Sequence, residues 1–89
     1  MRAIVTVVGK DTVGIIGRVC TQLANYNVNI LDISQTVLQG YFTMTMIVDV
    51  SNATVEIGEL IRLMGECGNE WNLSIRVQRE NIFDAMHKL

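Results

Sequence analysis

The sequence predicts an α+β fold of the ferredoxin-like type, a βαββαβ sandwich whose four-stranded antiparallel sheet carries two helices on one face. Segments with strand-like and helix-like apolar spacing follow one another in the order strand, helix, strand, strand, helix, strand. A Gln39–Gly40 turn joins the second and third strands into a hairpin. The chain has 89 residues, 49% of them apolar, so we expect residues 1–89 to form a single domain with one modest core.

The first expected strand covers residues 2–9, which are rich in Val, Ile and Thr and contain no breaker before Gly9. From Gly14 onward the apolar residues recur at helical spacing, until Asn25–Asn27 ends the helix. The apolar stripe of this helix contains Ile16, Val19 or Cys20, Leu23 and Ala24.

The second expected strand covers residues 28–38, and the third covers residues 41–50 with the most regular alternation in the chain. On the second strand, the apolar face holds Leu31, Ile33 and Val37, and the polar face holds Asp32, Ser34 and Thr36. On the third strand, one face holds Phe42, Met44, Met46, Val48 and Val50. We expect the apolar strand faces and the helical stripes to form the core.

Residues 51–54 supply several N-cap candidates for a second helix, and Gly68 is suited to the position just past its end. The stripe of this helix contains Ile57, Leu60, Ile61, Met64 and Cys67. Residues 73–78 alternate as a fourth strand, and residues 80–89 are expected to form a short C-terminal helix. Right-handed crossovers put the two main helices on the same face of the sheet.

Composition excludes several classes of function. The net charge is −2 and the seven basic residues are scattered, which disfavours nucleic acid as a partner. No apolar run approaches the roughly 20 residues that span a membrane, and no signal peptide is apparent, so we expect a cytoplasmic protein with no membrane partner. Cys20 and Cys67 form no CxxC pair, and we expect small buried thiols with no metal or cofactor.

Three glycines, Gly9, Gly14 and Gly17, punctuate the stretch "VVGKDTVGIIGRV". Their spacing fits neither the dinucleotide G-x-G-x-x-G pattern nor a Walker A loop, which would need Lys after its second glycine. An RNA-clamping "GIIG" loop is disfavoured by its apolar residues and the acidic chain. We expect Gly17 to allow close helix–sheet packing. The polar "KDT" at a helix N-terminus favours an anionic group such as a carboxylate, and Asp11 could cap the helix or receive an ammonium group.

The stretch "VTVVGKDTVGIIGRVCTQLANYNVNILDISQTV" resembles the opening of an ACT domain, with its strand, G-x-D-x-x-G-I turn, first helix and "N-I-x-D" second strand. The tail "ENIFDAMHKL" resembles that of small stand-alone single-ACT proteins. The resemblance implies a homodimer whose two sheets join side by side. It also implies that an amino-acid-like ligand binds at the interface, and that the response reaches a partner such as a metabolic enzyme or regulator.

By position, the resemblance places the ligand near the first turn and the start of the second strand. Asp11, Thr12, Val13 and Gly14 would form the turn side of the site, and Asn27 and Asn29 the other side. Serine-binding relatives have His where this chain has Gly9, so the resemblance does not extend to serine specificity. Many relatives have Pro where this chain has Val13.

The chain offers few candidates for catalysis, so we expect no enzyme activity. His87 is the only histidine and sits beside Lys88 in the tail. Asp32 and Asp49 could face each other across the hairpin as an acid–base or cation pair, although solvated carboxylates are the simpler interpretation. Met44 and Met46 are interpreted as packing residues, in preference to a copper site. The alternative function is a dimeric adaptor that binds proteins and has no small-molecule ligand.

Overall fold

The computed structural model describes residues 1–10 and 14–80. The element order is β1 (Arg2–Lys10), α1 (Ile15–Asn25), β2 (Asn29–Leu38), β3 (Tyr41–Asp49), α2 (Ile57–Trp71) and β4 (Ser74–Arg79). The βαββαβ order expected from the apolar spacing is therefore confirmed. The expected C-terminal helix at 80–89 lies, but for Glu80, outside the described residues.

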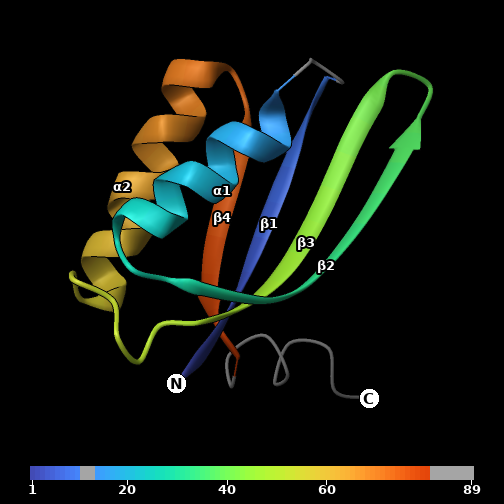
Figure 1. Cartoon of the computed structure of the whole chain (residues 1–89). Coiled ribbons are helices and arrows are strands. Elements are labelled where there is room, and N and C mark those ends of the chain that lie inside the picture. Colours follow the sequence, from blue (N-terminus) through green and yellow to red (C-terminus); the bar gives the residue numbers. More distant parts are fainter. Residues whose placement is uncertain (11–13, 81–89) are drawn as a thin grey trace.

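The four strands form one antiparallel sheet in the order β2-β3-β1-β4. Val5 of the central strand β1 pairs with Met46 of β3 on one side and Val77 of β4 on the other. Figure 1 shows both helices on one face of this sheet, with the β2–β3 hairpin extending away from them. This is the ferredoxin-like arrangement.

The core lies between that face and the two helices. Strand alternation places Val5 and Val7 beside Met46 and Met44, and all four side chains are fully buried. Their helical partners are Ile15, Val19 and Leu23 from α1 and Leu60 and Met64 from α2.

The helix stripes differ from the prediction at three residues that are exposed: Ile16 and Ala24 of α1 and Ile61 of α2. Ile15, spaced four residues before Val19, is buried, whereas Ile16 is 36% exposed. In α2, Leu60 and Met64 are buried, and Ile61 is 43% exposed. A helix of this length turns a narrow face towards the sheet, so neighbouring apolar residues remain at its border.

The expectation that Gly17 permits close helix–sheet packing is wrong. A Cβ atom added at Gly17 would have no neighbour within 4 Å. The close approach occurs instead at buried Gly68, where an added Cβ would lie 2.8 Å from the Leu73 carbonyl oxygen and 3.2 Å from the Ile75 nitrogen. Gly68 lies inside α2, which continues to Trp71, and left-handed Asn72 (φ 61°) follows as the C-cap. Gly68 is therefore the glycine that seats α2 against β4.

The apolar face of β2 does not join the core as expected. Leu31, Ile33 and Val37 are 48%, 40% and 53% exposed. Ile33 and Val37 share the helix-side face with buried Met46 and Phe42, their partners on β3. A bulge between Ile30 and Asp32 leaves Leu31 outside the pairing. Because β2 lies at the edge of the sheet, away from the helices, its apolar face is left uncovered (Figure 1).

Candidate functional site

Gly14 opens α1 in a conformation that suits glycine. Its φ is 88°, in the left-handed region, and its carbonyl oxygen accepts a 3.0 Å hydrogen bond from the Arg18 nitrogen. No side chain caps the helix at this residue, and an added Cβ would meet open space. Asp11, Thr12 and Val13, the remaining predicted residues of the turn, lie outside the described residues.

A hollow of about 480 Å³ adjoins Gly14 on the helical side of the molecule, lined by Gly14, Gly17, Arg18, Thr21, Gln22 and Trp71. The absent side chain of Gly17 helps to keep it open. The Arg18 guanidinium lies 6.0 Å from the centre of the Trp71 ring, at the outer limit of a cation–π contact. The turn region therefore has a cationic and aromatic neighbour that the sequence pattern did not single out, because Arg18 and Trp71 belong to different helices.

The two predicted asparagines lie where α1 leads into β2. Asn27 has a φ of 59°, and its Nδ2 donates a 2.9 Å hydrogen bond to the Asn52 carbonyl oxygen. This bond, together with the 2.9 Å bond from the Thr54 nitrogen to the Tyr26 carbonyl oxygen, ties the α1–β2 turn to the β3–α2 connection. Asn29 is exposed and begins β2 opposite Asp49.

One chain does not bring the two halves of the predicted site together. Gly14 precedes α1 and Asn27 follows it, so the 11-residue helix separates them by about 16 Å along its axis. Gly14 immediately precedes α1, whose first turn lies near the end of β1 (Figure 1), whereas Asn29 pairs with Asp49, the partner of Arg2 at the start of β1.

The two carboxylates considered as a pair are not directly opposed. Asp32 pairs with Ile47, and Asp49 pairs with Asn29. Asp49 accepts a 2.9 Å hydrogen bond from the Ser51 nitrogen, and the side-chain and backbone hydrogen bonds of Ser51 are the main cause that lowers the pKa of Asp49. Asp32 accepts a bond from the nitrogen of Ile33. Each carboxylate therefore accepts a bond from a nearby backbone N–H, Asp49 at the end of β3 and Asp32 beside the bulge of β2.

The two thiols are half-buried and unpaired with each other. Burial raises the pKa of Cys20 above its ordinary value. Burial, followed by the charges of Glu70 and Glu66, raises the pKa of Cys67. Raised thiol pKa values disfavour the thiolate, which is the nucleophilic form.

Within residues 1–10 and 14–80, no three His, Cys, Asp or Glu side chains gather as metal ligands. No helix in the same part of the chain has the length and hydropathy needed to cross a bilayer.

The βαββαβ architecture, with its β2-β3-β1-β4 sheet, is that of an ACT-type domain. The ACT domain family model matches residues 2–78, and the chain belongs to this family. A UPF0237 protein of Bifidobacterium longum is 53% identical over 88 residues, which cover 99% of this chain and 98% of that one.

The solved structure of an ACT domain protein from Streptococcus pneumoniae is also similar. It has a TM-score of 0.83 and 42% identity, with 94% of each chain covered. A formyltetrahydrofolate deformylase from Pseudomonas syringae has a TM-score of 0.79 and 21% identity, with 88% of this chain and 27% of that chain covered. At that identity, the likeness extends to the fold alone.

Proposed function

We propose that this protein is a non-catalytic regulatory module that works as a homodimer. Each interface would bind a small amino-acid-like ligand. The resulting shift in conformation or assembly would be transmitted to a partner protein such as a metabolic enzyme or regulator. Membership of the ACT domain family supports the regulatory role. The observation that supports the dimer is the edge strand β2, whose apolar side chains are uncovered.

Strand β2 has the properties of a pairing edge. It is ten residues long and, among the strands of residues 1–10 and 14–80, has a neighbour on one side only. The exposed apolar side chains of β2 are Leu31, Ile33, Val37 and Leu38. Exposed Tyr41, at the start of β3, pairs with Leu38 and lies beside them. Long apolar edges of this kind attract another strand unless charges or bulges protect them, and the one bulge lies near the start of β2. A second copy would cover both the strand backbone and these side chains.

Two-fold pairing of β2 with its copy would also assemble the predicted ligand site. Antiparallel pairing puts the end of one β2 beside the start of the other. Gly14 follows β1, which finishes at the same end of the sheet as β2, and Asn29 lies where β2 starts. The turn of one protomer would therefore lie at the same end of the joined sheet as Asn27 and Asn29 of its partner.

The chemistry of the two halves suits an amino acid. The N–H groups of the first turn of α1, at which Gly14 supplies no side-chain cap, favour a carboxylate, and Asp11 would receive the ammonium group. The amide side chain of Asn29 would orient the ligand from the other subunit. Such a ligand alters a partner only through its different affinity for the two conformational or assembly states.

The dimer is tested by charging the edge strand. Ile33→Lys places a cation at a residue that is 40% exposed on β2, and Ile61→Lys makes the same change at a residue that is 43% exposed on α2. We expect sedimentation to show at least a tenfold weaker dimer for Ile33→Lys and unchanged assembly for Ile61→Lys. Equal assembly of both variants would contradict pairing through β2.

The ligand is tested by calorimetric titration of the dimer with the twenty amino acids. We expect at least one amino acid to bind. Asp11→Ala and Asn29→Ala should abolish that binding, and Asn69→Ala, a change at an exposed residue of α2, should leave it intact. Flat traces for all twenty would contradict amino-acid sensing. A stable dimer that then captured a partner without any ligand would support the adaptor function.

A further inference from the structure

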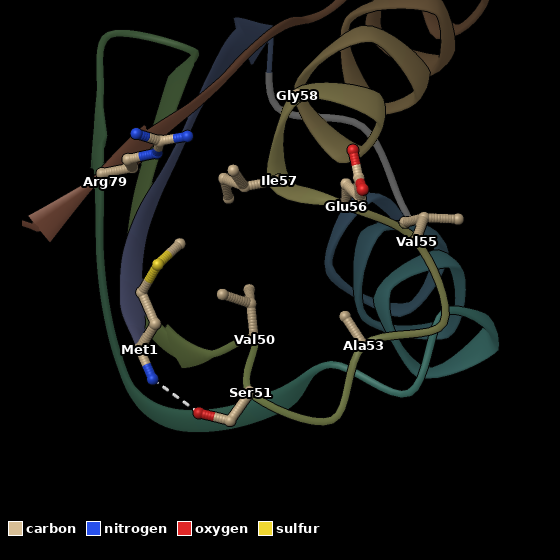
Figure 2. A pocket seen from close by; sticks show the side chains of 9 residues that line it. All are labelled: Met1, Val50, Ser51, Ala53, Val55, Glu56, Ile57, Gly58 and Arg79. Atoms are coloured by element: carbon tan, nitrogen blue, oxygen red, sulfur yellow. Dashed lines mark hydrogen bonds between the residues drawn. The ribbon is translucent and has the colours of Figure 1, made fainter.

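A second cavity lies at the end of the sheet opposite the Gly14 turn. Its volume is about 630 Å³, within the range of small-molecule pockets. Three separate segments form it: Met1 before β1, residues 50–58 in the β3–α2 connection and the start of α2, and Arg79 at the end of β4. Figure 2 shows these side chains arranged around the opening.

The walls of this cavity are mainly aliphatic. Val50, Ala53, Val55 and Ile57 are half-buried and pack against the core. In Figure 2, the side chains of Met1, Val50 and Ile57 border the open space. The Met1 nitrogen donates a 2.5 Å hydrogen bond to Ser51 Oγ, which holds this residue beside the β3–α2 connection. These walls favour an aliphatic group.

Arg79 supplies a cation at the rim. Strand alternation places it on the helix-side face together with buried Ile75 and Val77, at the point where that face passes the start of α2. Arg2 and Arg62 are paired with Glu80, and with Glu59 and Glu66, respectively. Arg79, in contrast, makes no ion pair with another residue in the described part of the chain. Within residues 1–10 and 14–80, the Arg79 guanidinium therefore has no carboxylate partner.

Glu56 supplies an anion on the other side of the opening. It is exposed, immediately precedes α2 and makes no side-chain capping bond. Figure 2 places the Glu56 carboxylate and the Arg79 guanidinium on opposite sides of Ile57. Two side chains of opposite charge, Arg79 and Glu56, thus lie at the cavity above its aliphatic floor, together with the Met1 ammonium group that is bonded to Ser51 Oγ.

We propose that this cavity is a second small-molecule site, which takes a small carboxylate with an aliphatic body, such as an aliphatic amino acid. Arg79 binds the carboxylate through charge-assisted hydrogen bonds, and Met1, Val50 and Ile57 contact the aliphatic body. Glu56 attracts an ammonium group where the ligand has one. The site is made by one chain, so it depends on neither the dimer nor the turn residues of the proposed function.

The experiment titrates the full chain by NMR with four probes: L-leucine, 4-methylpentanoate, 3-methylbutylamine and glycine. We expect L-leucine and 4-methylpentanoate to shift the Val50 and Ile57 resonances, with L-leucine binding more tightly because of Glu56. The amine lacks the carboxylate and glycine lacks the aliphatic body, so both should bind at least tenfold more weakly. No shift with either carboxylate would overturn the proposal.

Matched variants separate this site from the rest of the surface. Arg79→Gln should weaken L-leucine binding at least tenfold, while Arg76→Gln, an exposed arginine on the same strand outside the cavity, should not. Gly58→Met should fill the cavity, because a Cβ at Gly58 meets open space. Gly65→Met in the same helix serves as its control. Circular dichroism melting checks that each variant is folded.

Two further results would overturn the proposal. One is equal binding by Arg79→Gln and Arg76→Gln. The other is L-leucine binding that Asp11→Ala or Asn29→Ala abolishes and that Arg79→Gln leaves intact, which would place the ligand at the turn site. Absence of any amino-acid binding at the turn site, with the Val50 and Ile57 shifts still present, would contradict only the proposed function.

Discussion

Glycines carry different constraints at different positions of this chain. Gly14 has a φ of 88°, which an L side chain adopts only with strain. Gly17, three residues later and within α1, has no such constraint and an open surface above it. The sequence pattern identifies both as glycines near a helix start, but the backbone angles that distinguish them arise from how the chain leaves β1.

Alanine at these two positions should therefore change stability in opposite directions. Gly14→Ala should lower the free energy of unfolding by about 1 kcal/mol, because the left-handed conformation is strained for alanine. Gly17→Ala should raise it by up to about 1 kcal/mol, because alanine has the higher helix propensity. Urea denaturation measures both, and destabilisation of the same size at both positions would show that the two sites do not differ in this way.

At the scale of the elements, α2 makes a close backbone contact with the sheet in addition to the apolar packing that both helices share. Both helices bury an apolar stripe. In addition, α2 approaches β4 so closely that a side chain at position 68 would collide with the backbone of β4 and the residue before it. The periodic patterns predicted the elements to within a few residues. They misplaced the packing glycine, because close approach depends on how two distant segments cross.

The packing glycine can be tested within a single helix. Gly68→Ala should lower the free energy of unfolding by about 1–3 kcal/mol, since its Cβ would lie 2.8 Å from a backbone oxygen that cannot easily move. Gly65→Ala, with open space at its Cβ, should be neutral or stabilising. The midpoints of chemical denaturation give both values. A neutral Gly68→Ala would mean that α2 can move away from β4 without loss.

At the scale of the whole molecule, the alternation of apolar residues and the Gln39–Gly40 turn were enough to predict the topology. They could not predict that β2 would remain uncovered, because an apolar strand face has the same pattern whether its own helices or another chain covers it. The prediction that the apolar strand faces complete the core therefore failed at Ile33 and Val37. The exposure of these two side chains is also the first argument for a partner chain.

The candidate site was only partly predictable for a related reason. The resemblance to ACT domains pointed to Gly14 and Asn29, but a single chain holds them at opposite ends of α1 and β1. Arg18, Trp71 and Arg79 were not singled out, because their neighbours come from elements distant in the sequence. If the proposed function is correct, the ligand site belongs to the dimer.

The most direct measurement of that claim is complementation between two inactive variants. Asp11→Ala and Asn29→Ala should each abolish ligand binding as homodimers. In an equal mixture, about half of the dimers combine the two variants, and each of these regains one intact site, which makes about a quarter of all sites. Calorimetric titration of the re-equilibrated mixture should therefore recover binding at about a quarter of the wild-type stoichiometry, with wild-type affinity. No recovery, with mixed dimers shown to be present, would contradict a ligand site shared between two chains.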